Sequence, residues 1–242
     1  MGQLDGKIAV ITGAGSGIGL AVAERFAEEG AEVVLVGRQK ERLDEAAARI
    51  GGGARGESVD VGEEEQVRAL MEGLPRVDIL ATFAGKAVFG PVDELPPSAW
   101  KDLFHSRFFG QIHAVHHALP KMGKGSVILL CSGIADAAYV PDYAGGAAIC
   151  GAVNAMGKNL AVELAPREIR VNVLSPGFII ATDIKFNLED EKAIDFVKRS
   201  IADTPLPYHG YPKDLADAAL FLATCNFVTG QVIEVDGGWT AA

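Results

Sequence analysis

The chain has 242 residues, of which 49% are hydrophobic and 22% are charged, and its formal net charge at pH 7 is -10. This length and hydrophobic content predict a single globular domain over residues 1–242. An acidic chain repels phosphate backbones and anionic membranes, so we expect a small-molecule substrate or ligand and no nucleic-acid or membrane partner.

Three scattered cysteines form neither a disulfide framework nor a zinc motif, so no metal site is expected. The N-terminus lacks the apolar stretch of a signal peptide, and no apolar run is long enough for a membrane-spanning helix. These features favour a cytoplasmic protein.

The first predicted unit is a strand, a turn, a helix and a second strand. Residues 7–11 form a short apolar run that leads into a glycine-rich turn. Residues 20–30 carry apolar side chains with helical spacing, and Gly30 stands where a C-terminal cap is expected. Residues 32–36 form a continuous apolar run, which is typical of a strand buried on both faces of a parallel sheet.

The same alternation continues to the end of the chain. Further helices are predicted at residues 41–50, 63–73, 100–122 and 146–165, and further strands at residues 57–61, 77–83, 126–131, 170–174 and 231–235. Strands that alternate with helices predict a doubly wound α/β domain, a parallel sheet with helices on both faces. Residues 178–207, with a helical stretch at 190–201, are predicted to be a substrate lid.

The glycine-rich turn runs from Thr12 to Gly19, between a predicted strand and a predicted helix. Gly13 permits a sharp turn, Gly17 lets the backbone approach a pyrophosphate, and Gly19 lets the helix pack against the sheet. The helix N-terminus then offers free N–H groups to phosphates. This context predicts a dinucleotide site, and a turn without a ligand is the alternative.

Two further positions bear on the nucleotide. Asp60 follows the third predicted strand and either accepts a hydrogen bond from an adenine amino group or caps the helix that has Glu63 three residues later. Gly37 and Arg38 follow the second strand, where an acid would bind a ribose hydroxyl and an arginine suits a 2′-phosphate. NADP is therefore favoured over NAD, unless Arg38 is only a solvated surface charge.

In order along the chain, these motifs resemble those of the short-chain dehydrogenase/reductase family. Thr12–Gly19 is similar to the family's TGxxxGIG turn, Asp60-Val61 to its adenine-contacting motif, and Ala84-Gly85 to the end of its NNAG motif. Further similar motifs are Glu163–Pro166, Arg170–Asn172, Ser175–Gly177 and Val235–Gly238. The resemblance implies a seven-stranded Rossmann-type sheet, an oxidoreductase, and a homo-oligomer, either a dimer or a homotetramer.

The cofactor-binding positions predicted from the turn, the strand ends and the resemblance are Thr12, Gly13, Gly15, Ser16, Gly17, Ile18, Gly19, Arg38, Asp60, Val61, Ala84, Gly85, Pro176 and Gly177.

The resemblance also implies four catalytic residues, an Asn, a Ser, a Tyr and a Lys, and each of them is replaced here. Tyr143 is followed four residues later by Ala147, so the YxxxK spacing fails. An ungapped count back from Glu163 puts the Tyr position on Gly146, the Lys position on Cys150 and the Ser position on Gly133. A count from Trp100 and Gly110 puts the Asn position on Arg107, and Thr82 and Phe83 stand for the first two letters of NNAG.

Without the Tyr and the Lys, we expect ordinary alcohol–carbonyl interconversion to be slow or absent and the cofactor to be held weakly. The candidates for a rebuilt site are Arg107, Ser132, Tyr143 and Cys150. Arg107 stands where an inward-facing Asn is expected. It either clamps a carboxylate, phosphate or enolate, or pairs with an acid such as Asp142 or Asp102, or turns outward.

Tyr143 is either a displaced acid or an ordinary loop or interface aromatic. Cys150 stands near the predicted helix start, where a thiolate is favoured, or it fills space as a small apolar residue. Lys86 is either a substrate contact or a solvated charge. Packing or solvent exposure is the default role for His105, His113, His116 and His117.

Three functions remain open, and each predicts a different cavity. A divergent enzyme with redox-neutral or unconventional chemistry predicts a pocket lined by Arg107, Tyr143 and Lys86. A nucleotide-binding pseudoenzyme predicts a nicotinamide site filled by Phe83 or other apolar groups. An orthodox NADPH-dependent carbonyl reductase that uses Ser132 and Tyr143 predicts a Tyr143 hydroxyl in the space above a nicotinamide.

Overall fold

The computed structural model describes residues 2–180, 191–202 and 204–242. One seven-stranded parallel sheet forms the centre, with the order β3-β2-β1-β4-β5-β6-β7. The strands are β1 (Ile8–Thr12), β2 (Glu32–Gly37), β3 (Arg55–Ser58), β4 (Ile79–Thr82), β5 (Val127–Cys131), β6 (Arg170–Pro176) and β7 (Val232–Val235). The predicted doubly wound α/β fold and its seven strands are confirmed.

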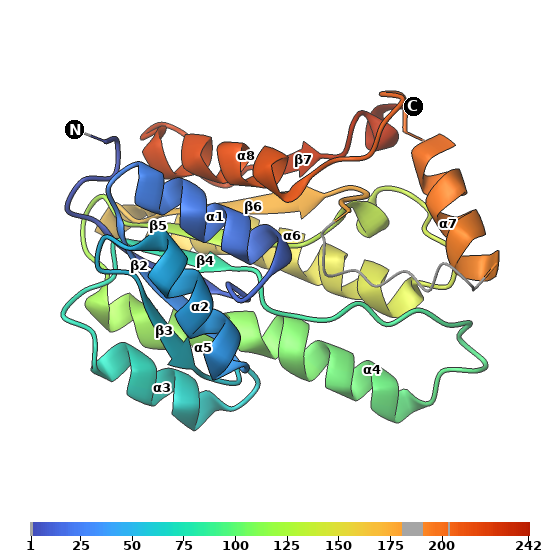
Figure 1. The fold of residues 1–242 in the computed structure, drawn as a ribbon. Coiled ribbons are helices and arrows are strands. Elements are labelled where there is room, and N and C mark those ends of the chain that lie inside the picture. Colours follow the sequence, from blue (N-terminus) through green and yellow to red (C-terminus); the bar gives the residue numbers. More distant parts are fainter. Residues whose placement is uncertain (1, 181–190, 203) are drawn as a thin grey trace.

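Helices cover both faces of this sheet (Figure 1). One face carries α1 (Gly17–Glu28), α2 (Lys40–Ile50) and α8 (Pro212–Thr224), and the other carries α3 (Glu64–Glu72), α4 (Pro97–Phe104), α5 (Gly110–Ala118) and α6 (Ala144–Leu164). Helix α7 (Glu191–Ala202) lies beyond the carboxyl ends of the strands. None of the helices in the described ranges is long and apolar enough to cross a membrane.

Each strand supplies side chains to two separate cores. In β1, Ile8 and Val10 pack with the α3, α5 and α6 side, whereas Ala9 and Ile11 pack with the α1, α2 and α8 side. Successive side chains of a strand point to opposite faces, so a strand covered on both faces must be apolar at every position. This requirement explains the continuous apolar runs that predicted the strands.

The helix predicted at residues 100–122 is the element that differs most in form. It begins at Pro97, since proline is favoured at a first helical position, and it consists of α4, a π-helical turn at His105–Phe109, α5 and a short 3₁₀ turn. A π turn inserts one extra residue into a helix and often occurs at functional sites. Arg107 lies within this turn.

Two other predictions need correction. Strand β3 covers residues 55–58 rather than 57–61, because Val59 and Val61 are core residues of the loop that follows it. Helix α8 was not predicted, although Pro212 opens it and the Asp214 carboxylate accepts the N–H of Tyr211 at 2.7 Å. The helix of the predicted lid is confirmed as α7, whereas residues 181–190 and 203 of that segment lie outside the described residues.

The neighbours β1 and β4 define where a ligand can enter. After β1 the chain turns to α1 on one face of the sheet, and after β4 it leads to α4 on the other. This divergence opens a crevice at the carboxyl ends of the strands, which is where doubly wound proteins bind ligands.

Candidate active site

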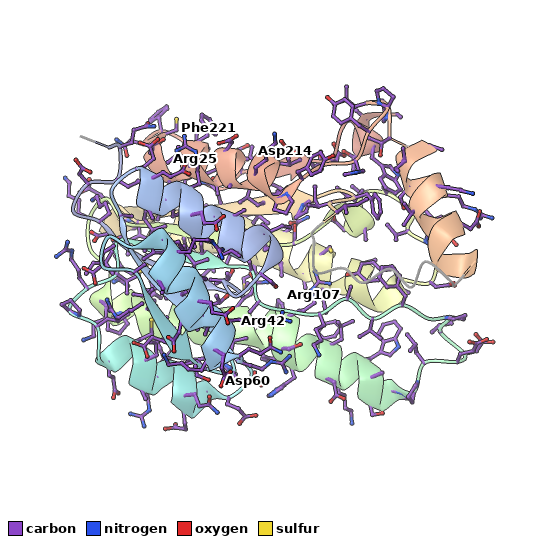
Figure 2. All side chains as sticks on the ribbon, viewed as in Figure 1. Arg25, Arg42, Asp60, Arg107, Asp214 and Phe221 are labelled. Carbon is purple, nitrogen blue, oxygen red and sulfur yellow. The ribbon has the colours of Figure 1, made fainter. Side chains whose placement is uncertain are left out.

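Two adjoining hollows lie at this carboxyl edge. One is a groove of about 770 Å³ and the other a cavity of about 550 Å³, and Ala84 and Gly85 line both of them. Figure 2 shows that the labelled Arg42, Asp60 and Arg107 gather at this end of the sheet. Arg42 and Asp60 line the groove, whereas Arg107 lines the cavity.

The glycine turn shapes the wall of the groove. Gly13 has φ +71°, in the left-handed region that favours glycine. A Cβ on Gly19 would lie 2.4 Å from the carbonyl oxygen of Gly13. The helix and the turn are therefore too close together for any side chain at position 19. Ser16 is the N-cap residue of α1, but its side chain makes no capping hydrogen bond, and the first turn of α1 contains no acidic residue. The unpaired N–H groups of this turn therefore fit a pyrophosphate.

Basic and acidic side chains lie on the opposite wall of the groove. The Arg38 Nη1 lies 3.9 Å from the Asp60 Oδ2, and both side chains are exposed. Asp60 Oδ1 accepts the N–H of Gly62 at 3.0 Å, and the N-cap of α3 is Glu63. The helix-capping alternative for Asp60 is therefore wrong, because its carboxylate stabilises the turn before the helix.

The predicted cofactor positions divide into residues that line a hollow and residues that shape the backbone. Those that line the groove are Gly13, Gly15, Ser16, Arg38, Asp60, Val61, Ala84 and Gly85. Ile18, Pro176 and Gly177 line the cavity, as do Ala84 and Gly85. Thr12, Gly17 and Gly19 line neither; the Thr12 Oγ1 accepts the N–H of Ala84 at 3.2 Å and so joins the end of β1 to the loop after β4.

Arg107 and Tyr143 form the polar centre of the cavity. The Arg107 Nη1 donates a hydrogen bond to the Tyr143 hydroxyl oxygen, and its Nη2 donates to the Ser132 carbonyl at 3.3 Å. Within the described residues, no carboxylate lies within 4.0 Å of this guanidinium. The alternative pairing with Asp102 or Asp142 is therefore not formed, and Arg107 points into the cavity toward Tyr143.

The ring of Tyr143 occupies the volume of a side chain that Gly146 lacks. A Cβ on Gly146 would lie 2.0 Å from the Tyr143 Cζ, an impossible distance. The other side of the ring is covered by Phe89, with ring centroids 4.5 Å apart. Tyr143 is thus a cavity residue rather than an ordinary loop aromatic, and it fills the space next to the family's Tyr position.

A buried glutamine holds the Arg107 turn in place. The Gln111 Nε2 donates to the carbonyls of Arg107 and Cys131, at 2.9 Å each. Its Oε1 accepts from the Thr82 hydroxyl at 2.7 Å and from the Cys131 N–H at 3.2 Å. One side chain therefore ties the π turn to the ends of β4 and β5.

Burial shifts the pKa of every ionisable group in the cavity, although in Arg107 other groups outweigh it. Burial disfavours the charge of Arg107, but Tyr143 and the two thiols favour it more, and its pKa is raised. Burial raises the pKa of Tyr143 above its ordinary value, although Arg107 opposes the shift. Burial also raises the pKa of Cys131 to about 12. At neutral pH the cavity contains a charged guanidinium among neutral groups.

Of the two alternatives for Cys150, the space-filling thiol is confirmed and the thiolate is wrong. Helix α6 begins at Ala144, two residues before the predicted start, and Cys150 lies beyond its first turn. The thiol is buried, and burial raises its pKa. Cys150 fills space beside Gly133, where a Cβ would lie 3.2 Å from its sulfur.

The remaining candidates take no part in the polar centre. The Ser132 hydroxyl is buried and donates to the Leu174 carbonyl at 3.4 Å. Lys86 is exposed and lines the groove rather than the cavity. His113 and His117 contact the Val61 carbonyl and Glu64, away from the cavity. Over the described ranges, no group of His, Cys, Asp and Glu side chains is arranged to hold a metal ion.

Sequence reasoning missed three residues of the site: Arg42 in the groove, and Phe89 and Gln111 at the cavity. Gln111 was detectable, since it is a polar residue four positions after Arg107 on the same helix. Arg42 lies in the first turn of α2, four residues after Arg38, and this nearness along the chain was the available signal. No local signal marks Phe89, which reaches Tyr143 only through the tertiary fold.

Comparison with known proteins agrees with this architecture. The family profile described as enoyl-(acyl carrier protein) reductase matches residues 13–240. Galactitol 2-dehydrogenase (L-tagatose-forming) of Cereibacter sphaeroides is 34% identical over 248 residues, which cover 98% of this chain and 96% of that protein. Gluconate 5-dehydrogenase of Gluconobacter oxydans is 33% identical over 254 residues, covering 99% and 97%.

A solved structure shares the fold over almost the whole length. The short-chain type dehydrogenase/reductase from Mycobacterium ulcerans superposes with a TM-score of 0.92 and 28% sequence identity, covering 98% of this chain and 91% of that one. On the profile match, the relatives and the shared fold together, the chain belongs to the short-chain dehydrogenase/reductase family of oxidoreductases, and this family implies a nicotinamide cofactor.

Proposed function

We propose that this chain binds NADP(H) and reduces a carbonyl group of a small molecule, with Tyr143 as the proton donor and Arg107 as its charged partner. It would thus be a divergent member of its family, with a rebuilt acid in place of the Tyr and Lys. The groove supports the cofactor, since its uncapped helix terminus suits a pyrophosphate. The guanidinium groups of Arg38 and Arg42 in the same groove support a 2′-phosphate, and therefore NADP over NAD.

The observation that carries the proposal is the hydrogen bond between Arg107 and Tyr143. Because Arg107 is the donor, the Tyr143 oxygen accepts, and its own hydroxyl proton is left for another acceptor. When bound, NADPH supplies a hydride to a carbonyl carbon and is oxidised to NADP. Tyr143 donates its proton to the carbonyl oxygen, Arg107 stabilises the phenolate that remains, and solvent returns the proton.

The raised pKa of Tyr143 suits the role of a proton donor. Burial keeps the phenol protonated at neutral pH, which suits the donation of a proton to a carbonyl oxygen. Alcohol oxidation requires the phenolate, which is scarce at that pH. The proposal differs from an orthodox reductase because Arg107 is the charged partner of Tyr143, and because the Ser132 hydroxyl donates to the Leu174 carbonyl.

Calorimetric titration with NADPH, NADH and NADP, followed by NADPH oxidation against a panel of carbonyl compounds, tests the proposal. We expect NADPH binding and measurable turnover in the wild type. Tyr143→Phe should lower kcat by about 10²–10⁴-fold without weakening NADPH binding. Tyr139→Phe is the matched control, since Tyr139 is 82% exposed and does not line the cavity.

Two results would overturn it. The absence of binding at millimolar NADPH would exclude a cofactor-dependent enzyme. Binding without turnover on any carbonyl would favour the pseudoenzyme, or redox-neutral chemistry at the same cavity. A cytoplasmic location and a homodimer or homotetramer remain predictions from the sequence, which fractionation and light scattering would test.

A further inference from the structure

The cavity contains a positive charge that no described lining residue neutralises. Among the described lining residues, Arg107 is the one side chain that is charged at neutral pH. Tyr143, Cys131 and Cys150 could supply negative charge only by ionising, and burial raises the pKa of each. The other side chains of the lining are neutral and mostly apolar, among them Phe83, Ile134, Val140, Phe178, Ile179 and Trp239.

The contacts of Arg107 leave this charge uncompensated. Both of its acceptors, the Tyr143 hydroxyl and the Ser132 carbonyl, are neutral oxygens. A guanidinium has further N–H groups beyond those two, arranged as a fork that matches a carboxylate. Removing a cation from water without a counter-ion is costly, so an anionic ligand in this cavity would gain a charge-assisted hydrogen bond.

The position of Tyr143 limits where that anionic group can lie. Because Arg107 and Tyr143 are hydrogen-bonded to each other, two ligand oxygens that accept from them must also be neighbours. A carboxylate oxygen and a keto oxygen are neighbours in a 2-oxo or a 3-oxo acid, and they are further apart in a 4-oxo acid. The apolar side chains of the lining would then surround the rest of the ligand.

We infer that the substrates are 2-oxo or 3-oxo carboxylates with an apolar substituent, whose carboxylate binds Arg107 while the keto oxygen faces the Tyr143 hydroxyl. This inference rests on the proposed function, since it names the substrate class of the same cavity. It assigns Arg107 a second role, that of selecting the substrate by its charge.

The wild-type protein tests this with matched acids and esters. Phenylpyruvate is compared with its methyl ester, and benzoylacetate with its ethyl ester, in NADPH-dependent turnover. We expect kcat/KM to be about 10–100-fold higher for each acid, the range that one hydrogen bond to a charged group gives. The 4-oxo acid 4-oxo-4-phenylbutanoate should show a smaller preference over its ester. An equal or reversed preference for the 2-oxo and 3-oxo esters would overturn the inference.

Three variants assign the preference to Arg107. Arg107→Met should reduce the acid-to-ester ratio to about one, and Arg107→Lys should retain part of it, because the charge stays while the fork is lost. Lys101→Met is the control, since it removes an exposed cation from α4 outside the cavity and should keep the wild-type ratio. An acid-to-ester ratio of kcat/KM in Arg107→Met that equals the wild-type ratio would overturn the inference. If the Met variant fails to fold, the ratio can still be measured in the wild type and in Arg107→Lys.

Two further results separate this inference from the proposed function. If the esters turn over as well as the acids, the substrate class is wrong and the proposed reductase stands. If no compound turns over, calorimetric titration with phenylpyruvate tests the ligand class on its own. Binding to the wild type that Arg107→Met abolishes would support a carboxylate ligand, and no binding to the wild type would overturn the inference. Benzoylacetone, a diketone that forms an enolate but has no carboxylate, is the last probe. A higher kcat/KM for benzoylacetone than for both acids would identify an enolate as the anion that binds Arg107 and would overturn the inference.

Discussion

The groove and the cavity adjoin each other but are built from different parts of the chain. One contiguous segment, β1 with its turn and α1, forms one wall of the groove, mainly with backbone N–H groups and with Gly13 and Gly19, which lack side chains. The opposite wall carries side chains such as Arg38 and Asp60. The cavity takes side chains from the loop after β4, the π turn, the end of β5 and the start of α6. The local geometry of the glycine turn maintains a wall made of backbone, whereas the side chains that line the cavity can be changed by single substitutions.

Arg107 and Tyr143 show what such rebuilding requires. The side chain missing at Gly146 makes room for the Tyr143 ring, and Arg107 stands where the resemblance predicts an Asn. The fold and the nucleotide groove tolerate both changes because neither touches the glycine turn. On the proposed function, family membership and catalytic chemistry are encoded in separate residues, so each should be open to perturbation without the other.

The most direct way to break the cavity alone is Gly146→Ala. The new Cβ would lie 2.0 Å from the Tyr143 ring, so the ring must leave and its bond to Arg107 must break. We expect NADPH-dependent turnover to fall by about 10²–10⁴-fold, the usual contribution of a general acid, with NADPH affinity unchanged. Steady-state kinetics and calorimetry measure the two effects.

Gly151→Ala, on the same helix, is the control for Gly146→Ala. Its Cβ would make an ordinary contact of 3.7 Å with Asp136, so this variant should keep wild-type turnover and gain about 0.5–1 kcal/mol of helix stability. Full activity in Gly146→Ala would mean that the position of the Tyr143 ring is irrelevant to the reaction.

The converse variant, Gly19→Ala, should damage the groove. Its Cβ would meet the backbone of Gly13 at 2.4 Å, so α1 must move away from the turn. We expect a loss of about 1–3 kcal/mol in the free energy of unfolding, as for other overpacked sites, together with weaker NADPH binding. Thermal melting with and without NADPH measures both, and Gly123→Ala, where a Cβ meets nothing within 4 Å, is the tolerated control. An unchanged melting temperature would contradict the close packing of helix and turn.

The pH profile sharpens the comparison, because it reports on the cavity alone. With a Tyr143 pKa above its ordinary value, the phenol is the dominant form from pH 6 to 9, so the rate of carbonyl reduction should be flat there. The reverse oxidation needs the phenolate and should rise about tenfold per pH unit across the same range. Kinetics in both directions measure this. A plateau in oxidation below pH 9 would show that Arg107 outweighs burial and lowers the Tyr143 pKa.

The same division explains what could be predicted from the sequence. The β1 strand, its turn and α1 follow from a local apolar run and the spacing of glycines, so the groove was located correctly. The π turn was not predicted, since one inserted residue hardly changes the helical spacing of the side chains around Arg107. The inward position of Arg107 was nevertheless predicted, because Trp100 and Gly110 fixed its register.

Tyr143 could not be placed in this way. Its contact with Gly146 depends on α6 beginning at Ala144, and its contact with Phe89 joins segments more than 50 residues apart. The burial of Cys150 has the same origin, and it decides between the two alternatives in favour of a space-filling thiol. The chemistry of the cavity is decided by such contacts between distant segments.

The smallest effect is expected at Arg38, where the groove depends on a side chain rather than on backbone. Its guanidinium is 58% exposed and shares the groove with Arg42, so Arg38→Gln should weaken NADPH binding by about tenfold or less and leave NADH binding unchanged. Lys40→Gln is the control, because Lys40 is an exposed cation of α2 that pairs with Asp44 and does not line the groove. Calorimetry with both nucleotides measures the ratio. Equal losses of affinity for NADPH and NADH would mean that Arg38 does not recognise a 2′-phosphate. The groove would then bind its nucleotide without a phosphate-specific contact from this side chain.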